Sequence, residues 1–142
     1  MKHTDKHRKG VSNIEDYRHE DGSWSKGFTE TTETEYIFYY TRAGKLWNVV
    51  NNRCKKKKNF LERMPCYSGV TNGFDDFQSF TDWCHTQGGY FQKESTGMFW
   101  QIDKDILYPG NKTYSQSTCC FVPGYVNSVL LTKRKEEKEL PI

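Results

Sequence analysis

The sequence lacks the features that mark membrane and secreted proteins. No apolar run in its 142 residues approaches the roughly 18 residues that a membrane-spanning helix needs. The N-terminal segment is charged and contains no apolar stretch of the kind found in secretory signals. We therefore expect neither a membrane-spanning nor a secreted protein.

Cysteine is present, but its pattern does not suit a disulfide framework. The five cysteines are odd in number and scattered, and they form no CxxC pair, so neither paired disulfides nor a zinc ribbon is indicated. We expect buried, reduced thiols, as in a cytosolic protein. The alternative is a looser structural Zn²⁺ site that combines Cys119 with one of three upstream residues, Cys54, Cys66 or Cys84.

The hydrophobic fraction is low, at 35%, and aromatic residues compensate for it. Nine Phe, nine Tyr and four Trp make up 15% of the chain. Because each aromatic ring buries more area than an aliphatic side chain, a small aromatic core is expected. A chain of this length is too short for two full cores, so we predict one domain.

The formal net charge is only +3, but the basic residues are clustered. Lys55–Lys58 is an uninterrupted block, whereas the basic cluster near the C-terminus is neutralised by adjacent glutamates. A basic block close to aromatic residues predicts a surface that binds a polyanion. The alternative is a solvated helix end, where lysines stabilise the negative end of the helix dipole.

Composition divides the chain into three parts. Residues 1–27 are polar and predict an N-terminal arm with little regular structure. Residues 28–132 form the predicted domain, and residues 133–142 form a charged C-terminal tail. The domain begins with a strand predicted over residues 29–40, where Thr and Glu alternate before a run of aromatic residues.

Two helices are predicted in the middle of the chain. Apolar residues at helical spacing between Leu46 and Cys54 indicate the first. The second is expected to bury an aromatic stripe, to carry His85 as a C-terminal cap, and to end at Gly88. Residues 90–97 are predicted to form a loop. The stripe consists of Phe74, Phe77, Phe80, Trp83 and Cys84.

A ββα unit is predicted at the end of the domain. Residues 98–103 and 119–122 indicate two strands, and a strong turn signal lies between them at Tyr108–Asn111. A helix is expected to begin after Pro123. The predicted fold class is therefore α+β, with a C-terminal ββα unit preceded by two helices and an N-terminal strand.

The ββα unit carries side chains that suit a metal ion. Folding its helix back over the strands brings Asn127 towards Asp103, and carboxylate and amide oxygens are ligands for Mg²⁺ or Mn²⁺. Such an ion polarises a scissile phosphodiester. The alternative is a solvated turn followed by a hydrogen-bonding asparagine. The polar residues of the unit are Asp103, Lys104, Asp105, Asn111 and Asn127.

The same unit resembles a known family of nucleases. The matching segments are Ile102–Ile106, Gly110–Lys112, Tyr114–Ser115, Thr118–Cys119, Phe121–Pro123 and Val126–Asn127. Further matches upstream are Leu46–Trp47, Arg53–Cys54, Tyr67–Val70 and the aromatic residues Phe77, Phe80 and Trp83. Together these segments resemble the HNH-type, or His-Me finger, endonucleases of bacteriophages, in particular the small homing-endonuclease-like proteins of T7-like phages. The resemblance covers roughly residues 45–131.

The resemblance implies a role for each matching residue. Asp103 falls on the metal-binding position of the first strand, and Asn127 on the final Asn or His of the helix. Lys104 replaces the histidine that serves as general base in the family, and Asp105 lies beside it. The ammonium of Lys104 then stabilises charge on the phosphate, or the site is catalytically inactive.

Two functions follow as expectations. The first is a metal-dependent DNA endonuclease of homing or nicking type, which hydrolyses phosphodiester bonds with Mg²⁺ or Mn²⁺ in the cytoplasm of the infected bacterial host. The alternative is a catalytically inactive HNH-fold phage protein that binds DNA or inhibits a host enzyme, with a host or phage protein as partner. In both, the expected DNA contacts are Lys55, Lys56, Lys57, Lys58, Asn111, Lys112 and Tyr114.

Overall fold

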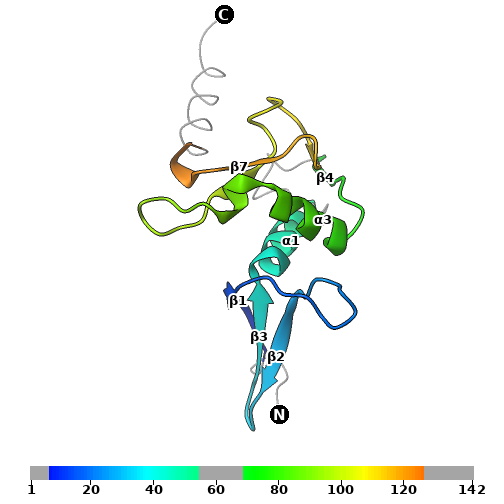
Figure 1. Ribbon diagram of the computed structural model, residues 1–142, viewed down its shortest axis with the longest axis vertical. Helices are drawn as coiled ribbons and strands as arrows, with labels where there is room; N and C mark the ends of the chain where they lie inside the picture. The colour runs from blue at the N-terminus through cyan, green and yellow to red at the C-terminus, as the bar shows by residue number, and fades with distance from the viewer. Residues whose placement is uncertain (1–6, 55–68, 127–142) are drawn as a thin grey trace, which may run out of the picture.

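The computed structural model describes residues 7–54 and 69–126. Figure 1 shows three strands at one end of the molecule, α1 running from them into the middle, and α3 with the last strands at the other end. This mixture confirms the α+β class. The elements are β1 (His7–Ile14), β2 (Gly27–Thr31), β3 (Tyr36–Thr41), α1 (Arg42–Arg53), β4 (Thr71–Asn72), α3 (Phe77–Thr86), the 3₁₀ helix η3 (Gly88–Phe91), β5 (Gln101–Asp103), β6 (Thr113–Tyr114) and β7 (Cys120–Val122).

The first sheet has the strand order β1-β3-β2, with β1 parallel and β2 antiparallel to β3. The prediction of one strand over residues 29–40 is wrong, because the chain turns between β2 and β3. In that turn, the backbone N–H of Thr32 donates to the carbonyl of Glu35 at 2.9 Å, and the Thr32 hydroxyl accepts from the Glu35 N–H at 3.0 Å. A Thr hydroxyl thus makes the turn without glycine or proline.

The N-terminal segment is more ordered than its composition predicted. The expectation of little regular structure over residues 1–27 is wrong from His7 onwards, where β1 begins. After β1, the backbone N–H and carbonyl of Trp24 pair with the side-chain amide of Gln78 in α3, at 2.6 and 3.0 Å. These contacts join residues that are far apart in the sequence, so the composition of the N-terminal segment alone could not predict them.

α1 confirms the first predicted helix, and its start is fixed by a side-chain cap. The Thr41 hydroxyl accepts from the Gly44 N–H at 3.0 Å and donates to the Ser25 carbonyl at 2.9 Å. A Cβ on Gly44 would lie 2.2 Å from the carbonyl oxygen of Lys26. Glycine is therefore needed where this helix meets the segment before β2.

α3 confirms the second predicted helix and supplies much of the core. The carboxylate of Asp76 caps its start by accepting from the Ser79 N–H at 2.8 Å. The aromatic stripe is buried as predicted, and Phe74 packs against Phe80 and Trp83 at ring-centroid distances of 5.0 and 5.2 Å. The buried core cluster comprises Val50, Val70, Phe74, Phe80, Trp83, Cys84, Tyr90, Ile102, Tyr114, Cys119 and Phe121.

The segment predicted as a loop over residues 90–97 begins inside η3, so this prediction is wrong at its start. Tyr90 is buried there, with its ring edge-on to Phe121 at a centroid distance of 5.3 Å. Gly89 makes this packing possible, because a Cβ on it would lie 3.0 Å from the Cβ of Phe121. The 3₁₀ helix η3 thus packs against β7 and completes this side of the core.

Both strands predicted for the C-terminal unit are present, but they are short. β5 and β7 pair antiparallel, with Ile102 opposite Phe121 and Asp103 opposite Cys120. A helical turn at residues 124–126 follows Pro123. The described part therefore has strand, loop, strand and helical turn in the predicted order, and Asn127 lies outside it. None of the described helices combines the length and the apolar composition that a membrane span requires.

Candidate nucleic-acid interface

Asp103 lies at the end of β5 and is only 7% exposed. Its Oδ2 atom accepts the backbone N–H groups of Asp105 at 2.8 Å and Ile106 at 2.5 Å. When a carboxylate accepts hydrogen bonds from the backbone N–H groups of the following residues, the chain bends into a turn and the strand ends. Asp103 therefore shapes the loop that carries the predicted catalytic residues.

Lys104 is also 7% exposed, although lysine is rarely buried without a partner. Its Nζ atom lies 3.1 Å from Oδ1 of Asp105 and 6.0 Å from the ring centroid of Tyr114. A carboxylate and an aromatic face both stabilise an ammonium. The structure thus brings Asp103, Lys104 and Asp105 together in one turn, with a cation held between acidic and aromatic groups.

Asn111 closes the loop between β5 and β6. Its Nδ2 group donates to the carbonyls of Lys104 at 2.9 Å and Thr113 at 2.6 Å, and its Oδ1 accepts from the Thr113 N–H at 3.2 Å. The predicted turn before it is present, with Gly110 at φ 81°. The amide of Asn111 therefore holds the loop, and a DNA contact from this residue stays a prediction.

Tyr114 is placed differently from the prediction. It is 2% exposed and lies in the core cluster, so its ring offers no surface for a direct DNA contact. Its hydroxyl accepts from Nη1 of Arg53 at 3.0 Å. Lys112, by contrast, is exposed, and its backbone carbonyl accepts from the Thr71 N–H at 2.8 Å.

The remaining predicted contacts fall outside the structural description. Lys55–Lys58 and Asn127 belong to segments that are not described. Among the residues that are, no group of three or more His, Cys, Asp and Glu side chains is arranged to hold a metal ion. A divalent cation at the predicted site would rely on Asp103, because the carboxylate of Asp105 already faces the Lys104 ammonium.

The four described cysteines are free thiols. Burial raises the pKa of the Cys119 thiol to about 11 and raises the pKa of Cys84 further. Burial also raises the pKa of the half-buried Cys54 and Cys120. A raised pKa disfavours the thiolate that binds zinc or attacks a substrate, which supports the expectation of buried, reduced thiols.

A groove of about 440 Å³ runs between α1 and the chain that leads into β5. Three basic side chains of α1 line it, together with apolar residues from α1 and from the chain that leads into β5. No carboxylate is among the described residues that line the groove. These residues are Arg42, Lys45, Leu46, Val49, Arg53, Met98, Phe99, Trp100, Gln101 and Ile102.

Arg42 is fixed at one end of this groove. Its guanidinium lies 3.8 Å from the ring centroid of Tyr90 and 3.7 Å from that of Phe99, and it donates to the carbonyl of Tyr90. Burial lowers the pKa of Arg42 from its usual high range, and the nearby Tyr90 and Asp16 oppose this effect. Its planar cation is therefore pre-organised beside an aromatic wall.

The groove and the Asp103 loop are neighbours. Ile102 lines the groove and directly precedes Asp103 in β5. At the other wall, Arg53 contacts the Tyr114 hydroxyl, and Lys104 lies over the same ring. The groove therefore ends beside this turn, although Asp103 and Lys104 are buried and are not among the described lining residues.

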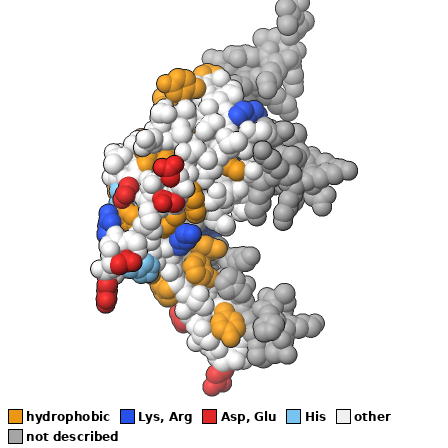
Figure 2. Space-filling view, turned by 90° about the vertical axis from the view of Figure 1, so that its right-hand side faces the viewer, with side chains coloured by type: hydrophobic (Ala, Val, Ile, Leu, Met, Phe, Trp, Pro, Cys, Tyr) orange, Lys and Arg blue, Asp and Glu red, His pale blue; other side chains and the backbone are white. Residues whose placement is uncertain are grey.

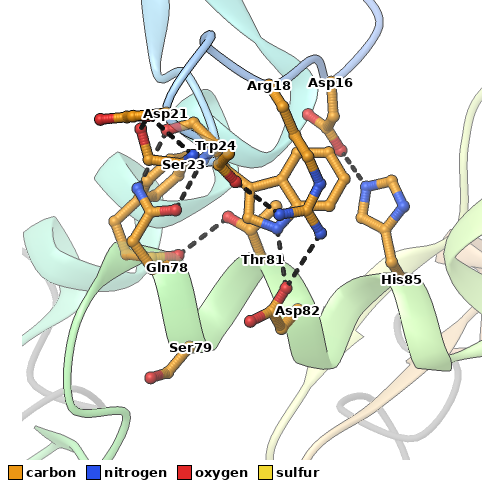
Figure 3. Close-up of polar contacts among 12 residues, drawn as sticks. Asp16, Arg18, Asp21, Ser23, Trp24, Gln78, Ser79, Thr81, Asp82 and His85 are labelled. Carbon is orange, nitrogen blue, oxygen red and sulfur yellow. Dashed lines mark hydrogen bonds and ion pairs between the residues drawn. The ribbon is translucent and has the colours of Figure 1, made fainter.

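Sequence reasoning missed a second polar cluster, which ties the N-terminal segment to both helices (Figure 3). The carboxylate of Asp16 accepts from the Ala43 N–H at 2.8 Å and from the Tyr90 hydroxyl at 2.6 Å, and its Oδ2 lies 2.8 Å from Nε2 of His85. Trp24 stacks on His85 at a centroid distance of 4.4 Å. Trp24 and Tyr17, two aromatic residues in a mostly polar segment, were the available signal.

His85 is in the last turn of α3, as predicted, and its side-chain partner is Asp16. On the face shown in Figure 2, described acidic side chains lie over the middle and lower part, and basic side chains are scattered among and above them. No single sign of charge covers that face. The groove therefore stands out as a place where described cations gather without lining carboxylates.

Comparisons with protein-family models, curated proteins and solved structures found no match for this chain.

Proposed function

We propose that the chain is a DNA-binding protein that holds the phosphate backbone in the groove beside α1. The observation that carries the proposal is the line of Arg42, Lys45 and Arg53 on one side of this helix, with no carboxylate among the described lining residues. Trp100 also lines the groove and offers an aromatic surface on which sugars or bases can pack. This is the DNA-binding alternative implied by the HNH resemblance.

The groove suits binding without strong sequence preference. Basic side chains contact phosphates, and each neutralised phosphate releases a condensed counterion. Such contacts position the DNA but carry no direct sequence information. Binding through this groove should therefore weaken steeply as salt rises.

A second function, metal-dependent DNA hydrolysis, is favoured by the position of Asp103 at the end of the β5–β7 pair, next to the groove. Asp103, with the predicted ligand Asn127, would hold Mg²⁺ or Mn²⁺, which would polarise the scissile phosphodiester. Lys104 would supply positive charge to the phosphate in the transition state. Asp105 would orient that ammonium through the contact at 3.1 Å.

Salt-dependent binding to a labelled duplex tests the groove. Lys45→Gln and Arg53→Gln should each weaken binding and lower the slope of log affinity against log salt by about 0.9. Arg18→Gln is the matched control, because it removes one exposed positive charge outside the groove. Equal effects of all three substitutions on the slope would show that the groove holds no particular phosphate.

Nicking of supercoiled plasmid with Mg²⁺ or Mn²⁺ separates the two functions. Asp103→Asn keeps an oxygen that can accept from the Asp105 and Ile106 N–H groups, so the loop should persist. An endonuclease would lose cleavage in this variant and keep duplex binding. Wild-type protein that binds the duplex without nicking it would establish the catalytically inactive alternative.

A further inference from the structure

A second cavity, of about 500 Å³, lies on the other side of α1, between the helix and β3. Its volume is within the range of sites for small organic ligands, about 300–1,000 Å³. Among the described residues, its lining and that of the basic groove have no member in common. Its lining consists of Lys26, Phe38, Tyr40, Gly44, Trp47, Asn48 and Asn51.

Aromatic rings form two walls of this cavity. Phe38 and Tyr40 are two residues apart in β3 and so share a face of the strand, with their rings edge-on at a centroid distance of 4.6 Å. Trp47 comes from α1, and its ring packs on Phe80 at 5.2 Å and Phe77 at 6.2 Å. The core thus fixes the indole, so a planar ligand would meet a pre-organised aromatic surface.

Polar groups at the cavity have complementary hydrogen-bonding character. Asn48 is exposed on α1, and Asn51 is oriented by a hydrogen bond from Nδ2 of Asn72 to its Oδ1 at 2.9 Å. A side-chain amide presents a donor and an acceptor side by side, which is the pattern on the edge of a nucleobase. Aromatic faces with nearby amides are the combination that reads unpaired bases.

Lys26 adds a positive charge at the rim. Its backbone is anchored because the Thr41 N–H donates to its carbonyl at 3.0 Å, and the lack of a side chain on Gly44 allows this close approach. Its Nζ atom lies 5.4 Å from the ring centroid of Phe77. No carboxylate is among the described residues of this lining, so an anionic group is tolerated there.

We propose that this cavity binds an unpaired base of single-stranded DNA together with its phosphate. The base stacks on the aromatic walls, Asn48 contacts its edge, and Lys26 contacts the phosphate. A neutral sugar would leave the lysine unused, and an apolar peptide would bury the amides without partners. The site goes beyond the proposed groove because it recognises an unstacked base rather than a duplex backbone.

Single-stranded homo-oligonucleotides and nucleoside 5′-monophosphates are the probes, with tryptophan fluorescence and the indole N–H resonance of Trp47 as readouts. Asn48→Ala should weaken single-strand binding about tenfold and leave duplex binding unchanged, since only an unpaired base presents its edge to this amide. Lys45→Gln is the matched control and should weaken duplex binding more than monophosphate binding. Trp47→Phe, which keeps an aromatic ring in the core, should lower affinity for all bases.

Three results would overturn the proposal. A nucleoside monophosphate that shifts no resonance in this cavity shows that no base binds there. Equal binding of neutral oligosaccharides and nucleotides assigns the cavity to sugars. Equal loss of duplex and single-strand binding in Asn48→Ala assigns the effect to one general polyanion surface. Monophosphate binding does not need the groove, so base binding in the cavity can be confirmed even if the protein binds no duplex. Likewise, duplex binding in the groove can be confirmed even if no base binds in the cavity.

Discussion

The Oδ2 atom of Asp16 lies 2.8 Å from Nε2 of His85, although 69 positions separate these residues in the chain. The Asp16 side chain is only 4% exposed, and it also accepts from the Tyr90 hydroxyl and the Ala43 N–H. One carboxylate therefore joins the N-terminal segment, the start of α1, the end of α3 and η3. Such a fully bonded buried group specifies how these elements meet.

Asp16→Asn should lower the free energy of unfolding by about 1–3 kcal/mol. The side-chain NH₂ group of the asparagine is a hydrogen-bond donor, and it would face groups that already donate to Asp16. Urea unfolding followed by tryptophan fluorescence measures the loss. Asp82→Asn is the matched control: Asp82 contacts Arg18 and the Trp24 indole on the surface, so its loss should cost about 0–1 kcal/mol. Equal small effects of both substitutions would contradict a central role for Asp16.

Much of the helical part of the fold could be predicted from the sequence. The aromatic spacing over Phe77–Thr86 and the capping Asp76 are local signals, and both appear in α3. The order of strands around the turn at Gly110 was also predicted, because turn residues and short apolar runs are local. The core residues on α3 follow from the same periodicity.

The parts that could not be predicted depend on long-range contacts. β1 pairs with β3 through the backbone, and its sequence from His7 to Ile14 has little strand character of its own. Lys104 is buried because Asp105 and Tyr114 surround it, which the order of residues alone does not specify. The Asp16 cluster was missed for the same reason, since each partner lies on a different element.

Thr41→Val tests the cap of α1. The substitution keeps the shape of the side chain and removes the hydroxyl that joins the Gly44 N–H to the Ser25 carbonyl. Stability should fall by about 1–2 kcal/mol, as for other capping residues. Thr41→Ser keeps the hydroxyl and should retain most of the stability. A fall in Thr41→Ser as large as in Thr41→Val would assign the effect to packing of the methyl group.

The buried thiols predict a loss of stability in alkaline solution. A thiol ionises near 9.0 when unfolded, whereas burial raises the pKa of Cys119 to about 11 in the folded protein. The folded state therefore keeps a proton that the unfolded state releases. This contribution is fully present below pH 9 and is lost as pH rises from 9 to 11. It amounts to about 3 kcal/mol for this residue.

Urea midpoints in the presence of a reductant, measured from about pH 8 to about pH 10.5, check this dependence. The midpoint should fall across this range, and the fall should be shallower in Cys119→Ala. The other described cysteines, whose pKa values burial also raises, should account for the remaining fall. A midpoint that stays constant over the range would contradict the linkage.

The predicted catalytic position holds a buried lysine with an acidic and an aromatic neighbour. Lys104 lies beside Asp105 and over Tyr114, and both neighbours stabilise its ammonium. Its Nζ atom donates to the Asp105 carboxylate at 3.1 Å. If the site hydrolyses DNA, a general base introduced at position 104 should therefore help to activate the nucleophile.

Lys104→His should raise the rate of metal-dependent nicking of supercoiled plasmid, whereas Lys104→Ala should lower it. Histidine has an ordinary pKa near 6.5, so at neutral pH its free imidazole can take a proton from the attacking water. Rates with Mn²⁺ across about pH 6 to 8 should then rise with pH in the histidine variant. Asp105→Asn is the control, because it removes the partner of Lys104 without adding a base. Activation of nicking in Asp105→Asn as strong as in Lys104→His would show that release of the ion pair, rather than a new base, causes the gain.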